Sequence, residues 1–175
     1  AMLTKEYSIQ SAALFNPSVV PHPDQSGLEK GQIRFVMSLR SVGESHISSI
    51  EFRSGVLNSD GAFKLDPAGR YSVRGAITER YNETDYQLVF PNDSELSERV
   101  LFPQTETESM GMEDLRLVAF NDGGETVYYG TYTAYNGREI RSQVLQTTDF
   151  RTFTIKTLKS KSAQEIARAA RQSGK

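Results

Sequence analysis

Cysteine is absent from this chain of 175 residues, and histidine occurs only twice. Without cysteine there can be no disulfide framework and no thiolate zinc site, and two histidines are too few for a histidine-rich metal site. We therefore expect neither a structural metal nor an organic cofactor.

An excess of basic residues is also lacking, since 20 Lys and Arg stand against 22 Asp and Glu, for a net charge of -2. Binding to a nucleic-acid backbone needs such an excess, so no nucleic-acid partner is expected. No apolar run approaches the roughly 20 residues that span a bilayer. The opening stretch AMLTKEYSIQ lacks the apolar centre of a secretory signal. These features predict a cytoplasmic protein without a membrane partner.

Runs of β-branched and aromatic residues separated by turn residues dominate the sequence, as is typical of antiparallel strands. In the second half the runs are LRLVAF, TVYYGTYTAY, REIRSQVLQTT and FTIKTL, with NDGGE after the first and Asn136-Gly137 after the second. Asn-Gly is the preferred two-residue hairpin turn, because both positions tolerate a positive φ. The pattern predicts an all-β fold with a four-stranded antiparallel meander in this half.

The first half repeats this plan with the runs FNPSVVP, QIRFVMSLRS, HISSIEFRSGVL and AFKL, and Phe63 in the last run corresponds to Phe153 of the second half. Each unit has roughly 50 residues, within the range of propeller blades. Two unrelated meanders are the alternative. We predict a single domain over 1–175, a partial β-propeller with a first blade at 12–66, a connector at 67–112, a second blade at 113–158 and a tail at 159–175.

The tail has the pattern of a short amphipathic helix. Ser162 and Glu165 have the spacing of a capping box, and Ile166 with three alanines forms one apolar face. We expect a short C-terminal helix at about 163–172 without a catalytic role.

The stretch GMEDLRL at 111–117, followed by VYYGTYTAYNG and TTDFRTF, resembles the signature of glycoside hydrolase family 130. Members of that family typically show Gly-x-Glu-Asp-x-Arg, Tyr-x-x-Tyr-Thr-Ala-Tyr and Thr-x-Asp-Phe-x-x-Phe in this order. FNPSVV and FVMSLRSVGESHISSIEFRSG are similar to the preceding blade of the same family. The resemblance covers about 12–158 and implies two blades of a five-bladed β-propeller that cleaves β-mannosides with inversion, by phosphate or water.

The motif contains the residues that such chemistry needs. Cleavage of a glycosidic bond requires an acid to protonate the leaving oxygen and a nucleophile on the opposite face of the ring. The resemblance implies that Asp114 is the proton donor, acting in the phosphorylases through a sugar hydroxyl. Neighbouring strand residues point to opposite sides, so Glu113 is expected to bind a sugar hydroxyl or accept a structural hydrogen bond. Arg116 is expected to orient Asp114; an acidic turn with a solvated arginine is the alternative.

Further sugar-binding residues follow from the resemblance to the first blade. It implies that Asn16, in FNPS, binds a sugar hydroxyl, and that Arg40, at the end of FVMSLR, lies at the same site. His46 matches a second polar position, where many family members have arginine. An edge-strand charge is the alternative for Arg40, and a hydrogen-bonded loop histidine is the alternative for His46.

The tyrosines of the TVYYGTYTAY run have two possible roles. Tyr135 is expected to stack on a sugar ring, because an aromatic face suits the apolar side of a pyranose. Tyrosine-rich strands more often supply core residues, and we expect that role for Tyr128 and Tyr132.

The sequence favours a glycosidase or glycoside phosphorylase that binds an oligosaccharide or β-mannoside, with inorganic phosphate as a candidate co-substrate. A carbohydrate-binding or assembly module without catalysis, and a purely structural β domain, are the alternatives. In the family the groups that hold phosphate come from later blades, so little or no activity is expected from this chain alone. Two blades are also expected to expose Phe35, Met37, Val144 and Leu145, which favours a homo-oligomer, most simply a twofold dimer.

Overall fold

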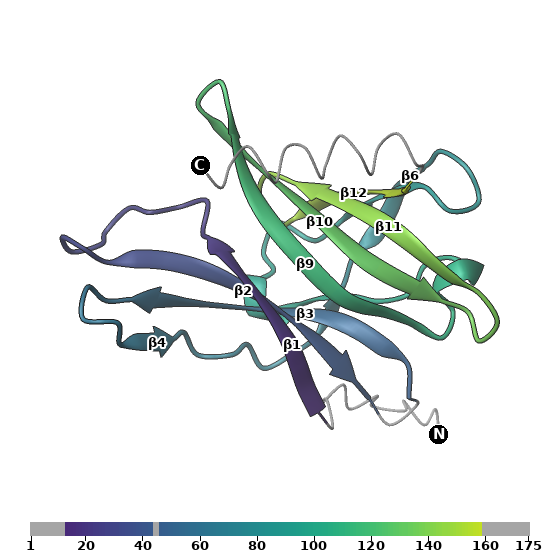
Figure 1. Ribbon diagram of the computed structural model, residues 1–175, viewed down its shortest axis with the longest axis horizontal. Coiled ribbons are helices and arrows are strands. Elements are labelled where there is room, and N and C mark those ends of the chain that lie inside the picture. Colours follow the sequence, from purple (N-terminus) through teal and green to yellow (C-terminus); the bar gives the residue numbers. More distant parts are fainter. Residues whose placement is uncertain (1–12, 44–45, 159–175) are drawn as a thin grey trace.

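The computed structural model describes residues 13–43 and 46–158 (Figure 1), and the helix predicted at 163–172 lies outside them. Within these ranges nearly all regular secondary structure is strand, so the predicted all-β class is confirmed. No helix in the described part is long and apolar enough to cross a membrane. The elements are β1 (Ala13–Pro21), β2 (Ile33–Val42), β3 (Ser48–Leu57), β4 (Phe63–Leu65), β5 (Val73–Arg74), β6 (Ala76–Arg80), β7 (Tyr86–Val89), the 3-10 helix η1 (Leu96–Glu98), β8 (Arg99–Leu101), the 3-10 helix η2 (Glu106–Glu108), β9 (Gly111–Asp122), β10 (Glu125–Tyr135), β11 (Ile140–Thr147) and β12 (Thr152–Thr157).

One open, mixed sheet connects the strands in the order β1-β2-β3-β9-β10-β11-β12-β7-β6, while β4 and β8 pair with β3 and β5 pairs with β8. Strands β1 to β4 form one antiparallel meander and β9 to β12 form another, in the predicted order. A single parallel pair, Ser48 with Gly111, joins the backbones of the two meanders. This arrangement fits a partial propeller or a β-sandwich.

The connector at 67–112 contributes strands of its own. Strand β7, in the run YQLVF, pairs with β12 on one side and with β6 on the other, so six strands lie side by side in the second half. Strand β8 pairs instead with β3 of the first half. The connector therefore pairs with strands of both meanders and links them.

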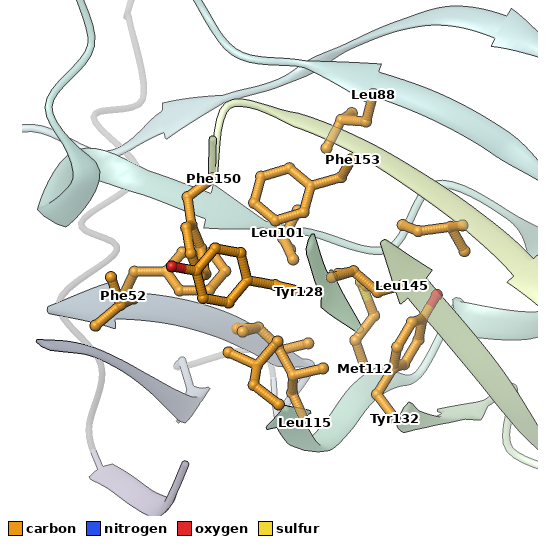
Figure 2. Packing of buried hydrophobic residues seen from close by; sticks show 14 of the residues in the cluster. Phe52, Leu88, Leu101, Met112, Leu115, Tyr128, Tyr132, Leu145, Phe150 and Phe153 are labelled. Carbon is orange, nitrogen blue, oxygen red and sulfur yellow. The ribbon is translucent and has the colours of Figure 1, made fainter. Parts of the chain in front are cut away.

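The two meanders share one aromatic core (Figure 2). The ring of Phe52, from β3, lies 5.7 Å from the rings of both Phe150 and Phe153, which belong to the second half. Tyr128 packs on Phe150 at 4.7 Å and donates a hydrogen bond to the carbonyl of Pro21 on β1, at 2.6 Å. Because these contacts cross between the halves, neither meander has a complete core alone. Tyr128 and Tyr132 are buried, as predicted.

Exposure differs between the equivalent phenylalanines of the two meanders. Phe153 is 0% exposed, whereas Phe63 is 66% exposed. The cause is the position of the strand: β12 lies between β11 and β7, but β4 pairs only with β3. The repeat in the sequence therefore extends to the strands but not to the packing at this position.

The apolar patch predicted from Phe35, Met37, Val144 and Leu145 is wrong for two of its members. Leu145 is 0% exposed because it belongs to the shared core, and Phe35 is 8% exposed. A Cβ atom at Gly55 would lie 2.7 Å from the ring of Phe35, so that ring lies directly over the glycine. Other apolar side chains of the first meander are exposed, and we call them the outer apolar residues: Val19, Ile33, Leu57, Phe63 and Leu65.

The hairpin turn at Asn136-Gly137 also differs from the sequence prediction. The two-residue loop is Gly123–Gly124, where φ is +62° and +96°. Asn136-Gly137 instead belongs to a four-residue loop, since Tyr135 pairs with Ile140. The side-chain oxygen of Asn136 accepts hydrogen bonds from two backbone N–H groups of that loop, at 2.9 and 2.7 Å, which favours the longer turn.

A buried carboxylate fixes the connector just before β9. Glu108, which is 0% exposed, accepts hydrogen bonds from the hydroxyls of Tyr132 at 2.5 Å and Tyr86 at 3.1 Å, and from the backbone N–H of Gln104 at 2.9 Å. Burial, reinforced by the nearby carboxylate, holds the pKa of both phenols well above the ordinary value. These bonds anchor η2, and β9 begins three residues beyond Glu108 at Gly111.

Candidate functional site

Two β-bulges interrupt strands β1 and β9. Asn16 and Pro17 oppose a single residue of β2, and Asp114 and Leu115 oppose a single residue of β10. The first residue of each bulge has left-handed backbone, with φ of +54° at Asn16 and +56° at Asp114. Asn and Asp tolerate this conformation better than other residues with a side chain. A bulge turns its side chain away from the strand's alternation and is common beside active sites.

The two bulges meet across the molecule. The side-chain amide of Asn16 donates a hydrogen bond to Oδ1 of Asp114. Behind this contact, Nη1 of Arg116 donates to the carbonyl of Pro17 at 2.8 Å, and the backbone N–H of Leu117 donates to Oγ of Ser18 at 2.9 Å. Strands β1 and β9 are not neighbours in the sheet. These bonds therefore place the two bulges side by side.

Arg40, on β2, contacts both acids of the motif. Its Nη2 donates to Oε1 of Glu113 at 2.7 Å, and its Nη1 lies 3.6 Å from Oδ1 of Asp114. The expectation that these adjacent acids point to opposite sides is wrong here, because the bulge at Asp114 breaks the alternation of β9. The side chains are 22% exposed for Arg40, 24% for Glu113 and 43% for Asp114, so the group is open to a ligand.

Two residues that the sequence did not single out support Arg40. Oγ of Ser48 accepts a hydrogen bond from Nε of Arg40 at 3.1 Å, and the guanidinium lies over the ring of Phe15, 5.2 Å from its centroid. Phe15 pairs directly with Arg40 across β1 and β2. Only the strand register reveals this neighbourhood, so the sequence carried no signal for either residue.

The side chains of the remaining predicted site residues make no hydrogen bond to Asn16, Arg40, Glu113 or Asp114 within the described residues. Arg116 binds the carbonyl of Pro17, and the guanidinium beside the carboxylate of Asp114 is that of Arg40. His46 is exposed with a φ of +56°, and its ring makes no hydrogen bond to the network in the described part of the chain. Tyr135 is half-buried, and its carbonyl accepts the N–H of Met110 at 2.9 Å.

We call Asn16, Arg40, Glu113 and Asp114 the polar cluster. It combines one amide, one guanidinium and two carboxylates, so it offers both donors and acceptors and carries one net negative charge. Such a set of paired donors and acceptors suits hydroxyl groups, each of which donates and accepts. Among the described residues no group of three or more His, Asp or Glu side chains is placed to hold a metal ion.

Comparison with solved structures finds two similar chains. One is a candidate glycosidase from Bacteroides thetaiotaomicron, with 17% identity and a TM-score of 0.38. The other, with 20% identity and a TM-score of 0.40, comes from work on the GH130 family of mannoside phosphorylases, which reports glycoside hydrolases that target β-1,2 mannosidic linkages in Candida mannan. Each match covers 82% of this chain and 31% of the other. No family model and no curated protein matches the sequence.

Proposed function

We propose that this chain binds a β-mannoside at the polar cluster, and that Asp114 is the acid of an inverting cleavage by phosphate or water. The observation that carries the proposal is the meeting of two bulges, in which Asn16 and Asp114 both adopt left-handed backbone and contact each other. Residues with a side chain that adopt this backbone conformation are often found at ligand sites. The sequence motif that resembles glycoside hydrolase family 130 contains one of these residues, and FNPS contains the other.

Each member of the cluster has a distinct part in this proposal. Asp114 is the most exposed of the three charged side chains, at 43%, and so can reach a leaving oxygen or a sugar hydroxyl. Asn16 holds Asp114 and offers its amide oxygen to a hydroxyl. Arg40 holds both acids in place, and Glu113, which is engaged by Arg40, acts as a hydroxyl ligand.

A binding module without catalysis is the second candidate. It is favoured by the mutual pairing of the cluster, in which every member already has a partner within the protein. A surface of this kind is preorganised for recognition, because little ordering is left to occur on binding. Catalysis needs in addition a nucleophile held on the far side of the sugar ring. We therefore expect sugar binding to be easier to detect than turnover.

The test measures binding of β-mannosides to the purified chain by titration. The ligands include the β-1,2-, β-1,3- and β-1,4-linked mannobioses, each with and without phosphate. Released mannose and mannose 1-phosphate are measured in the same samples. Asp114→Asn preserves the size of the side chain but removes the acid. General acid catalysis is worth about 10²–10⁴-fold, so turnover should fall by that factor while sugar affinity changes much less.

Asp60→Asn is the matched control. Asp60 lies in the turn after β3, at the opposite end of that strand from Ser48, and its carboxylate accepts the N–H of Ala62 at 2.9 Å. It should leave both binding and turnover unchanged. Saturable binding without turnover would assign the chain to the second candidate. The absence of binding to every β-mannoside would exclude both.

A further inference from the structure

We infer that Ser48 is a positioning residue of the polar cluster, because its hydroxyl sets the rotation of the Arg40 guanidinium. The consequence for sugar binding rests on the proposed function. The geometry itself does not, because it consists of contacts among the protein's own side chains.

The guanidinium of arginine is a planar, rigid fork, so two bonds and one face contact fix all of its atoms. For Arg40 the bonds are Nε to Oγ of Ser48 at 3.1 Å and Nη2 to Oε1 of Glu113 at 2.7 Å. The face contact is the ring of Phe15. With these three in place, Nη1 has one direction left, and it points to Oδ1 of Asp114 at 3.6 Å.

Ser48 is well placed for this role because it is itself immobilised. It is 2% exposed and begins β3, where it pairs with Val42 and, across the parallel bridge, with Gly111. A Cβ atom at Gly111, where φ is +154°, would lie 2.9 Å from Cβ of Ser48. The glycine therefore lets β9 come close enough for Ser48 Oγ to lie 3.4 Å from Oε1 of Glu113 as well.

Loss of the Ser48 hydroxyl frees one of the three constraints. The guanidinium can then rotate about its remaining bond to Glu113, which moves Nη1 relative to Asp114. A net hydrogen bond of ordinary strength corresponds to a factor of about 2 to 10 in an equilibrium. We therefore expect solvent exchange of the Arg40 Nε–H to become faster by a factor of that size. We expect sugar affinity to fall by a similar factor.

The experiment compares Ser48→Ala with Ser49→Ala in the full 15N-labelled chain. Ser49 is the next residue on β3 and is equally buried, at 3% exposure, but alternation directs its side chain to the other face. Solvent exchange of the Arg40 Nε–H is followed by NMR at mildly acidic pH, with Arg40→Lys used to assign its signal. Ser48→Ala should speed this exchange about 2- to 10-fold, and Ser49→Ala should not. Equal exchange in the two variants would overturn the inference.

The binding arm uses a double-mutant cycle. Ser48→Ala should weaken β-mannoside affinity in the wild-type background and have no further effect in Arg40→Lys, because its influence passes through the guanidinium. The same loss in both backgrounds would also overturn the inference. If the wild-type chain binds no sugar, the proposed function fails, and the exchange comparison still decides the role of Ser48. Ser48→Cys repeats the exchange test if the alanine variant lowers the unfolding midpoint.

Discussion

Replacement of Glu108 by glutamine is expected to destabilise the fold, although the side chain keeps its size. The carboxylate accepts from three donors: Oε1 from Tyr132, Oε2 from Gln104 N, and both oxygens from Tyr86. Glutamine has one acceptor oxygen and one NH₂ group. If the NH₂ replaces Oε2, it faces the backbone N–H of Gln104, so that donor loses its acceptor in the buried interior.

One donor left without an acceptor costs about 1–3 kcal/mol. For a domain of this size each kcal/mol lowers Tm by about 2–4 °C, so the expected loss is about 2–12 °C. The chain has eight tyrosines and no tryptophan, so tyrosine emission reports unfolding in urea directly. Tyr132→Phe should cost less on top of Glu108→Gln than alone, because the two residues share a bond.

Glu106→Gln is the control, since Glu106 lies on the same 3-10 helix and is exposed. It should change stability by less than about 0.5 kcal/mol. Equal unfolding midpoints for the two glutamine variants would refute the reasoning, because they would show that the buried carboxylate contributes no more than a solvated one.

Three further outcomes are expected. Burial raises the pKa of Asp85, but hydrogen bonds outweigh it, the largest coming from the N–H of Thr157, so the net pKa is lowered. The urea midpoint should therefore fall as pH drops below about 4. The fall should be smaller in Asp85→Asn. The pKa of Tyr86 is raised, so the free energy of unfolding should fall as pH rises above about 10. Urea unfolding at alkaline pH would check this, and Tyr86→Phe should lose less stability than the wild type. The outer apolar residues should drive self-association, so Phe63→Ser should lower the average mass in sedimentation, and a monomeric wild type would contradict this.

Local patterns were sufficient to predict most strands. The β-branched runs predicted the order of both meanders, and TVYYGTYTAY placed Tyr128 and Tyr132 in the core. Burial that depends on distant neighbours could not be predicted in this way. Phe63 and Phe153 have similar sequence surroundings, but only Phe153 has strands on both sides.

The site was harder to predict, because its geometry depends on the bulges. Alternation along a strand separates Glu113 from Asp114, and nothing in GMEDLRL marks the left-handed residue that brings them together. The sequence also favoured Arg116 over Arg40 as the partner of Asp114, since proximity along the chain is visible and register is not. Glu108 lies in the polar stretch TETESM, where no pattern distinguishes a buried acid from a solvated one.

The bonds that join the two bulges and hold Arg40 to Glu113 span 73 to 99 residues of chain. Closing such long loops costs entropy before any contact can compensate, and contacts of high sequence separation slow folding. The polar cluster takes residues from both meanders, so it cannot assemble before Asp114 has been added and the two halves have docked. If the polar cluster binds sugar as proposed, ligand binding during refolding would therefore report the docking of the two halves.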